Sequence, residues 1–196
     1  SDQTTLNNIS VKNNGGSGIV LSGDVTISNA IITGNGTNSE ADYQACIDNC
    51  IEVGASGECP SWGGSGHCAC NCIYNTSGGG IYMYGGAPNL INVTIADNVF
   101  AEEVQGGGIY FSHNSNSIVN NEPTIINSII YNNYPYNVDE NFQDMGPEPE
   151  TYNFPSFLHS DVEGGLLEHW ENLGGNIESD PLFINSNNGN FNLSSN

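Results

Sequence analysis

One nine-residue pattern occurs four times without gaps, as LNNISVKNN (6–14), ISNAIITGN (27–35), LINVTIADN (90–98) and IINSIIYNN (125–133). In every copy the first and sixth positions are Leu, Ile or Val, and the third and ninth are Asn. A glycine-rich motif follows as GSGIVL (16–21), GGGIYM (78–83) and GGGIYF (106–111). The shortest repeat distance, from Leu6 to Ile27, is about 21 residues, which is the length of one solenoid coil.

This repeat predicts an all-β protein, a parallel β-helix (solenoid) of about five coils. β-branched residues dominate the short apolar runs, and no helical period of 3.6 appears in the repeats. Asn and Gly fall where the chain must turn, because both accept left-handed backbone angles at low cost. An antiparallel sandwich would show turn signals without a fixed coil-length repeat, and it is the less favoured fold.

The asparagines of the pattern are expected to stack on successive coils and to hydrogen-bond in structural ladders rather than to bind a ligand. They form a third-position row and a ninth-position row: Asn8, Asn29, Asn92 and Asn127, then Asn14, Asn35, Asn98 and Asn133.

The whole chain, residues 1–196, is predicted to be a single domain. Three segments leave the coils after a ninth-position Asn, so we expect them to project from one side, where solenoids tend to bind. They are a cysteine-rich insertion at 36–77, a short loop at 99–105 and an acidic loop rich in Pro and Asn at 134–156. Residues 176–196 are expected to form the C-terminal coil.

The C-terminal half resembles a known family. It contains, in order, NSIIYNN (127–133), HSDVEGG (159–165), GNIESDPLFI (175–184) and GNFNL (189–193). This order resembles the end of secreted bacterial right-handed parallel β-helix proteins. The alternation of the Asn pattern with Gly-Gly-Gly-Ile resembles the polymorphic outer-membrane protein repeat of surface adhesins. The resemblance implies a right-handed β-helix outside the cell or at its surface, followed by an anchoring or sorting segment, and it implies a scaffold rather than an activity.

The charge of the chain limits its partners. One Lys, no Arg and 22 Asp or Glu give a formal net charge of −21 over 196 residues. A nucleic-acid binder needs a cationic face, and so does a protein that docks on anionic lipids. No stretch approaches the roughly 20 apolar residues of a membrane span. We therefore expect neither nucleic acid nor membrane insertion.

The six cysteines cluster between positions 46 and 72 and predict three disulfides in an oxidising, extracellular compartment. Their spacing does not match the paired C-x2-C of zinc ribbons, although His67 beside the cluster makes a metal site the alternative. Fifteen connectivities are open. The residues are Cys46, Cys50, Cys59, Cys68, Cys70 and Cys72.

Calcium and glycans are two further candidate ligands. The oxygen spacing of a calcium loop is imitated by Asp139, Asn141, Gln143 and Glu150, although Asp144 stands where Gly is expected and prolines interrupt the loop. Sequons for N-glycosylation occur at Asn8, Asn35, Asn75, Asn92 and Asn192, about as many as chance gives. Asn75, in the insertion, is the best glycan candidate.

The sequence argues against an enzyme. Lyases that act on acidic polysaccharides need a basic proton acceptor, and this chain has one Lys and would repel a polyuronate. Hydrolysis by two carboxylates stays open, with Asp139, Glu140 and Asp144 as the acids, although loop acids in so acidic a protein are usually just solvated. The four histidines are scattered, and His169 and Trp170 fall in a segment where one helical turn is expected.

Neither end of the predicted β-helix carries a cap in the sequence, and natural solenoids cap their ends. We therefore expect neighbouring copies to occupy the ends. The favoured hypothesis is a non-enzymatic extracellular structural or adhesive protein that assembles end to end into a filament. It requires no cofactor.

Two alternatives stay open. A carbohydrate-binding adhesin passenger domain would bind glycans at its insertions, where the aromatic residues at 62, 82–84 and 131–136 could stack on sugar rings. A calcium-dependent polysaccharide-degrading enzyme is the third reading.

Overall fold

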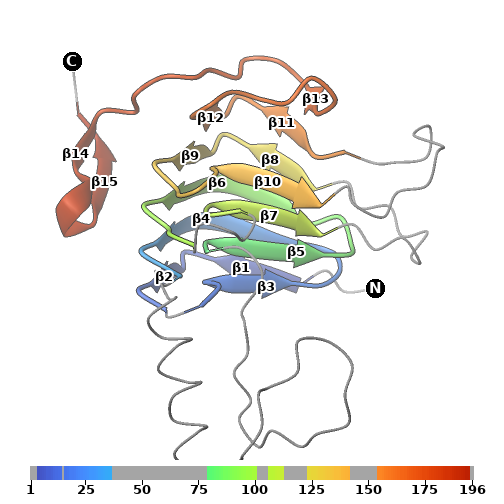
Figure 1. Cartoon of the computed structure of the whole chain (residues 1–196), viewed down its shortest axis with the longest axis horizontal. Coiled ribbons are helices and arrows are strands. Elements are labelled where there is room, and N and C mark those ends of the chain that lie inside the picture. The colour runs from blue at the N-terminus through green and yellow to red at the C-terminus, as the bar shows by residue number, and fades with distance from the viewer. Residues whose placement is uncertain are drawn as a thin grey trace, which may run out of the picture.

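The computed structural model describes residues 4–14, 16–36, 79–100, 106–112, 123–141 and 154–194. Within these residues the protein is all-β, with two parallel sheets and one small antiparallel sheet, which confirms the predicted class and its parallel strands. Successive circuits of the chain lie one above another (Figure 1), an arrangement that is compatible with a solenoid.

The larger sheet has nine strands and carries the four copies of the nine-residue pattern on its first four levels. Its strands are β1 (Thr4–Asn7), β2 (Ser10–Lys12), β4 (Val25–Thr33), β6 (Asn89–Ala96), β8 (Thr124–Ile126), β9 (Ile129–Tyr131), β11 (Ser156–Leu158), β12 (Asp161–Val162) and β13 (Glu171–Asn172). The smaller parallel sheet carries the glycine-rich motif and pairs β3 (Ile19–Leu21), β5 (Ile81–Tyr84), β7 (Ile109–Ser112) and β10 (Val138–Asn141) in that order.

The pairing register places equivalent repeat positions in rows, as the sequence alignment predicts. One row of paired residues is Leu6, Ile27, Leu90, Ile125 and Phe157. A second is Val11, Ile32, Ile95, Ile130 and Val162. A third, in the smaller sheet, is Ile19, Ile81, Ile109 and Val138. Between the first level and the last, the members of these rows are fully buried, so the rows form one continuous core.

Glycine is required where consecutive circuits approach each other most closely. A Cβ atom on Gly80 would lie 2.5 Å from the carbonyl oxygen of Gly108, and one on Gly108 would lie 2.2 Å from that of Asn137. A side chain at either position would force neighbouring circuits apart, which explains the glycine directly before β5 and β7.

The predicted loop at 134–156 differs from the structure, because its residues Val138–Asn141 form strand β10. β10 pairs in parallel with β7 and adds a fourth strand to the smaller sheet. Its sequence, VDEN, hides the strand, since Val138 supplies only one apolar side chain to the core. Residues 142–153 lie outside the described part of the chain.

The C-terminal end of the stack is covered, contrary to the expectation of an uncapped end. Leu166 and Trp170 pack against the core, and Trp170 is 5 % exposed. They belong to a segment that crosses the end of the stack, here called the cap segment (residues 163–173). The helical turn expected there is a hydrogen-bonded turn, with Trp170 N donating to Leu167 O at 3.0 Å.

Residues 176–196, expected as a final coil, contain an antiparallel hairpin of β14 (Phe183–Asn185) and β15 (Asn190–Leu193). The 3-10 turn η2 (Ser186–Asn188) and Gly189, with φ of 75°, reverse the chain, so the two strands pair with each other instead of with the preceding level. The hairpin stands beside the stack (Figure 1). The ring of Phe183 meets that of Tyr131 on β9 edge to face, with the ring centroids 6.3 Å apart.

In the described part of the chain, no helix has the length and apolar character that crossing a membrane would require.

Candidate functional site

The ninth-position asparagines form a row of hydrogen bonds inside the stack, here called the interior ladder (Asn14, Asn35, Asn98 and Asn133). The Nδ2 of each donates to Oδ1 of the next, at 2.8, 3.0 and 2.8 Å in chain order. Each of these oxygens also accepts the main-chain N–H of the preceding asparagine. Asn35 and Asn98 have no exposed surface. Their polar atoms are therefore used by the scaffold and are closed to a ligand.

Two residues that the repeat did not reveal extend the interior ladder. Asn133 Nδ2 donates to Asn137 Oδ1 at 2.8 Å, and Asn137 Nδ2 donates to Glu163 Oε2 at 2.9 Å. Glu163 Oε2 also accepts the main-chain N–H of Asn132 at 2.7 Å. Because Glu163 Oε2 only accepts in these two bonds, the ladder ends at the first residue of the cap segment.

The third-position asparagines form an outer row at the bend between neighbouring strands. Asn127 Nδ2 donates to Asn92 Oδ1 at 2.6 Å, and Asn92 Nδ2 donates to Asn29 Oδ1 at 3.1 Å. Their φ angles lie between 49° and 55°, in the left-handed region that Asn tolerates. Asn8 has the same backbone angle, but Asn29 donates to Asn7 Oδ1 at 2.9 Å. The predicted place of Asn8 in the side-chain ladder is therefore wrong, because its neighbour Asn7 presents the acceptor.

A buried carboxylate lies at the C-terminal end of the core. The strand register places Glu140 above Phe111, in the row that begins with Leu21 and Met83. Its side chain therefore enters the core, and the residue is 7 % exposed. Trp170 Nε1 donates to Glu140 Oε1 at 2.8 Å, and His169 Nε2 contacts the same oxygen. No local sequence signal predicts this burial, since Glu140 stands among acids that are typical of a solvated loop.

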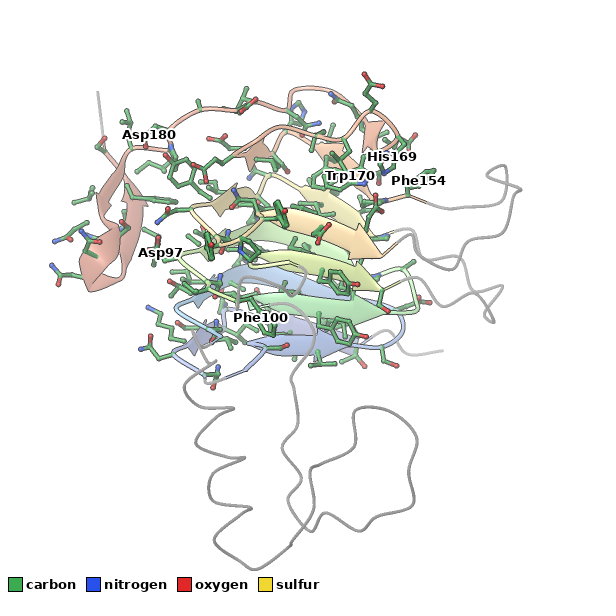
Figure 2. All side chains as sticks on the ribbon, viewed as in Figure 1. Asp97, Phe100, Phe154, His169, Trp170 and Asp180 are labelled. Atoms are coloured by element: carbon green, nitrogen blue, oxygen red, sulfur yellow. The ribbon has the colours of Figure 1, made fainter. Side chains whose placement is uncertain are left out.

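Aromatic rings enclose this carboxylate. Trp170 stacks on Phe157 with ring centroids 5.5 Å apart, and the His169 ring meets the edge of Phe154 at 4.8 Å. Figure 2 shows Phe154, His169 and Trp170 gathered at one end of the stack. Since only 2 % of the Glu140 side chain is exposed, a substrate can reach it only by displacing the cap segment. The contacts of Glu140 with Trp170 and His169 therefore hold the cap segment against β10.

The two adjacent acids of β10 face opposite sides of the sheet. Asp139 pairs with Tyr110, and Glu140 pairs with the core residue Phe111. Burial raises the pKa of Asp139, and the nearby Glu140 raises it further. Burial also raises the pKa of Tyr110, and the charge of Asp139 adds to that effect. The two carboxylates do not converge on one point as a hydrolytic pair must, and Asp144 lies outside the described residues.

The calcium candidate does not have loop geometry where the structure describes it. Asp139 and Asn141 belong to strand β10, while Gln143 and Glu150 lie outside the described residues. Of the residues with described positions, no three His, Cys, Asp or Glu come together as metal ligands would.

Glycosylation at Asn35 is wrong as a prediction, because this side chain is fully buried in the interior ladder and a glycan needs a surface site. Asn92 is exposed, but its Nδ2, the atom that would carry the glycan, is bonded to Asn29. Asn8 and Asn192 are exposed. Asn75 and all six cysteines lie outside the described residues, so the predicted disulfides stay a prediction.

The first level of the stack leaves strand edges without a partner in the described residues. β1 and β2 pair only with β4, and β3 pairs only with β5. We call these three strands the open edge. The core residues of this level are less covered than their equivalents above, since Leu6, Ile9, Val11 and Ile19 are only partly buried and Val20 is 56 % exposed.

No protein-family model, no curated protein and no solved structure matches the chain. The resemblance drawn from the sequence motifs thus stays a prediction.

Proposed function

We propose that this protein is a non-enzymatic, extracellular structural or adhesive protein, built as a right-handed parallel β-helix of about five coils. In this proposal the coils are a rigid spacer and the ends are contact surfaces. Copies of the chain would associate end to end, and a further contact at the opposite end of the stack would extend the assembly into a filament.

The observation that carries the proposal is that the buried polar side chains form hydrogen bonds within the protein and stabilise its fold. The amides of the interior ladder bond to one another, and the buried Glu140 bonds to the cap segment. A repeat selected for binding or catalysis would leave some of these groups facing a ligand. The open edge, by contrast, presents strands with no further partner among the described residues, together with partly exposed apolar side chains.

Electron microscopy of the purified chain, combined with sedimentation over a wide concentration range, tests this function. We expect particles that join along the stacking axis. Monodisperse single particles at every concentration would contradict assembly through the ends.

Carbohydrate binding is the second candidate, and one observation favours it. Tyr82 and Tyr110 stack on the smaller sheet with ring centroids 5.9 Å apart, and aromatic rows of this kind bind sugar rings. Tyr110 is 4 % exposed, however, which leaves the half-buried Tyr82 as the accessible ring. Binding on a glycan array that is lost in Tyr82→Ala would favour this candidate over the first. Calcium-dependent polysaccharide hydrolysis loses support from the opposed directions of Asp139 and Glu140.

A further inference from the structure

The open edge carries its unpaired hydrogen-bonding groups on alternate residues. Asn8 N donates to Ser28 O, Ile31 N donates to Ile9 O, and Asn13 N donates to Thr33 O. Because the main-chain groups of a strand alternate in direction, those of the intervening residues point away from β4. These residues are Thr5, Asn7, Ser10 and Lys12.

The interior ladder is also incomplete at this end. Asn14 Nδ2 and N both donate to Asn35 Oδ1, but among the described residues no donor reaches Asn14 Oδ1. Asn14 is exposed, whereas Asn35 and Asn98 are fully buried. Unpaired groups of this kind on an edge are a template for another chain.

Charge separates the two ends of the stack. The described residues between positions 4 and 36 contain one base and one acid, Lys12 and Asp24. The described residues 154–194 contain six acids and no Lys or Arg: Asp161, Glu163, Glu168, Glu171, Glu178 and Asp180. Of the two described ends, the open edge is thus the one at which two copies of this chain, with its net charge of −21, repel each other less.

We propose that the open edge binds the open edge of a second copy of this chain about a two-fold axis. The proposal deepens the proposed function, on which it rests, by naming the end that makes the contact. A two-fold axis between Asn8 and Ile9 makes the partner's strands run antiparallel. It sets Thr5 opposite Lys12 of the second copy and Asn7 opposite Ser10, so the outward-pointing residues of β1 and β2 meet one another.

The same register is electrostatically complementary. Asp24 precedes Val25, which pairs with Thr4 at the start of β1, and Lys12 ends β2. Antiparallel docking therefore brings Lys12 of each copy toward Asp24 of the other, twice per dimer. Both side chains are exposed, and neither has an ion-pair partner in the described part of the chain. Head-to-tail docking would instead set the open edge against the cap segment.

Charge reversal in the whole chain tests the contact, with dimerisation measured by sedimentation equilibrium at low salt. Lys12→Glu and Asp24→Lys each replace two attractions by two repulsions, and we expect each to raise the dimer Kd about tenfold. The double variant restores both pairs with the signs exchanged and should return the Kd to within about twofold of the original. Glu168→Lys, an exposed charge reversal at the opposite end, is the charge-matched control and should not weaken the dimer.

Hydrogen exchange at Ser10 and Lys12 separates this occupant from others. We expect these amides to be protected in the dimer and to exchange freely on dilution.

Assembly that is insensitive to both single variants would overturn the edge-to-edge contact and leave assembly through the ends standing. Closed dimers that obey the charge reversal would support the contact and contradict the filament. A monomer would overturn both, and protected amides in that monomer would assign the edge to a segment of the same chain.

Discussion

Asn98 shows most directly what a single ladder residue contributes. It is fully buried, accepts two hydrogen bonds from Asn35 and donates to Asn133 Oδ1 and to Ile32 O. Asn98→Ala would leave the N–H groups of Asn35 buried without their acceptor. We expect the free energy of unfolding to fall by about 2–4 kcal/mol, measured by urea denaturation, because an orphaned buried polar group costs about 1–3 kcal/mol.

Asn92→Gly is the matched control for Asn98→Ala. It removes an amide of the outer row at an exposed position, and Gly tolerates the φ of 55° there. We expect a loss of less than about 1 kcal/mol, since the freed groups can bond to water. Equal losses for the two variants would show that burial does not set the value of a ladder amide.

The raised pKa of the half-buried Asp139 should make the stability of the fold depend on pH. Its pKa is raised in the folded protein, so the folded state binds the proton more tightly than the unfolded chain does. That contribution is complete at low pH and is lost as the pH rises through the folded pKa. Asp139→Asn, which keeps an acceptor for Glu140 N, should match the parent at low pH and exceed its stability at neutral pH. Thermal unfolding at a series of pH values measures this difference, and a gap that does not change with pH would contradict it.

At the scale of elements, β10 and the cap segment meet at the buried Glu140, whose Oε1 is contacted by both Trp170 and His169. Trp170→Phe keeps the stacking on Phe157 but removes the N–H that Glu140 accepts. We expect a loss of about 1–3 kcal/mol in the free energy of unfolding, because a buried carboxylate loses a donor. Glu140→Met alone restores the apolar row that contains Met83, but it leaves the Trp170 N–H unpaired.

The double variant Glu140→Met/Trp170→Phe removes both polar groups. We expect it to be more stable than the sum of the single changes predicts, because a buried polar pair can be replaced by apolar side chains at little cost. Additive losses in a double-mutant cycle would mean that Glu140 and Trp170 are not coupled, and that the hydrogen bond between them does not hold the cap segment.

The repeat predicted the elements that obey it and missed those that depart from it. The rows that start at Leu6, Val11 and Ile19 follow from the alignment, because each level repeats the same apolar positions. β10 escaped prediction because Glu140 replaces an apolar residue of its row, and its side chain accepts a hydrogen bond from Trp170, which lies 30 residues later in the sequence. No local pattern carries such a contact. The glycan candidate Asn35 failed for a related reason, since a sequon does not report burial.

The C-terminal hairpin shows how turn chemistry can override a repeat. Residues 189–193 resemble the last strand of a β-helix, but Gly189 directs them back onto β14. The hairpin keeps contact with the stack through Phe183 and Tyr131. A two-stranded hairpin is marginal alone, so its place beside the stack depends on such side-chain contacts.

At the scale of the whole molecule, the uneven charge makes the stack sensitive to salt. The described residues 154–194 hold six acids without a Lys or Arg, and several, such as Glu168 and Glu171, are exposed. Like charges on one end repel one another more in the compact state than in the expanded one. Salt screens this repulsion, with a Debye length of about 10 Å at 0.1 M.

We therefore expect Tm to rise as NaCl increases from about 10 to 300 mM, and choline chloride at equal ionic strength to act equally, because screening does not depend on the cation. Replacing Glu168 and Glu171 with Gln removes two charges from the acidic end and should flatten this dependence. Asp24 is the one acid among the described residues between positions 4 and 36, where Lys12 balances its charge. Replacing Asp24 with Asn should therefore change the salt dependence of Tm less. A slope that these variants leave unchanged would place the salt effect outside the described acidic end. It would also remove the charge asymmetry as a reason for copies to meet at the open edge.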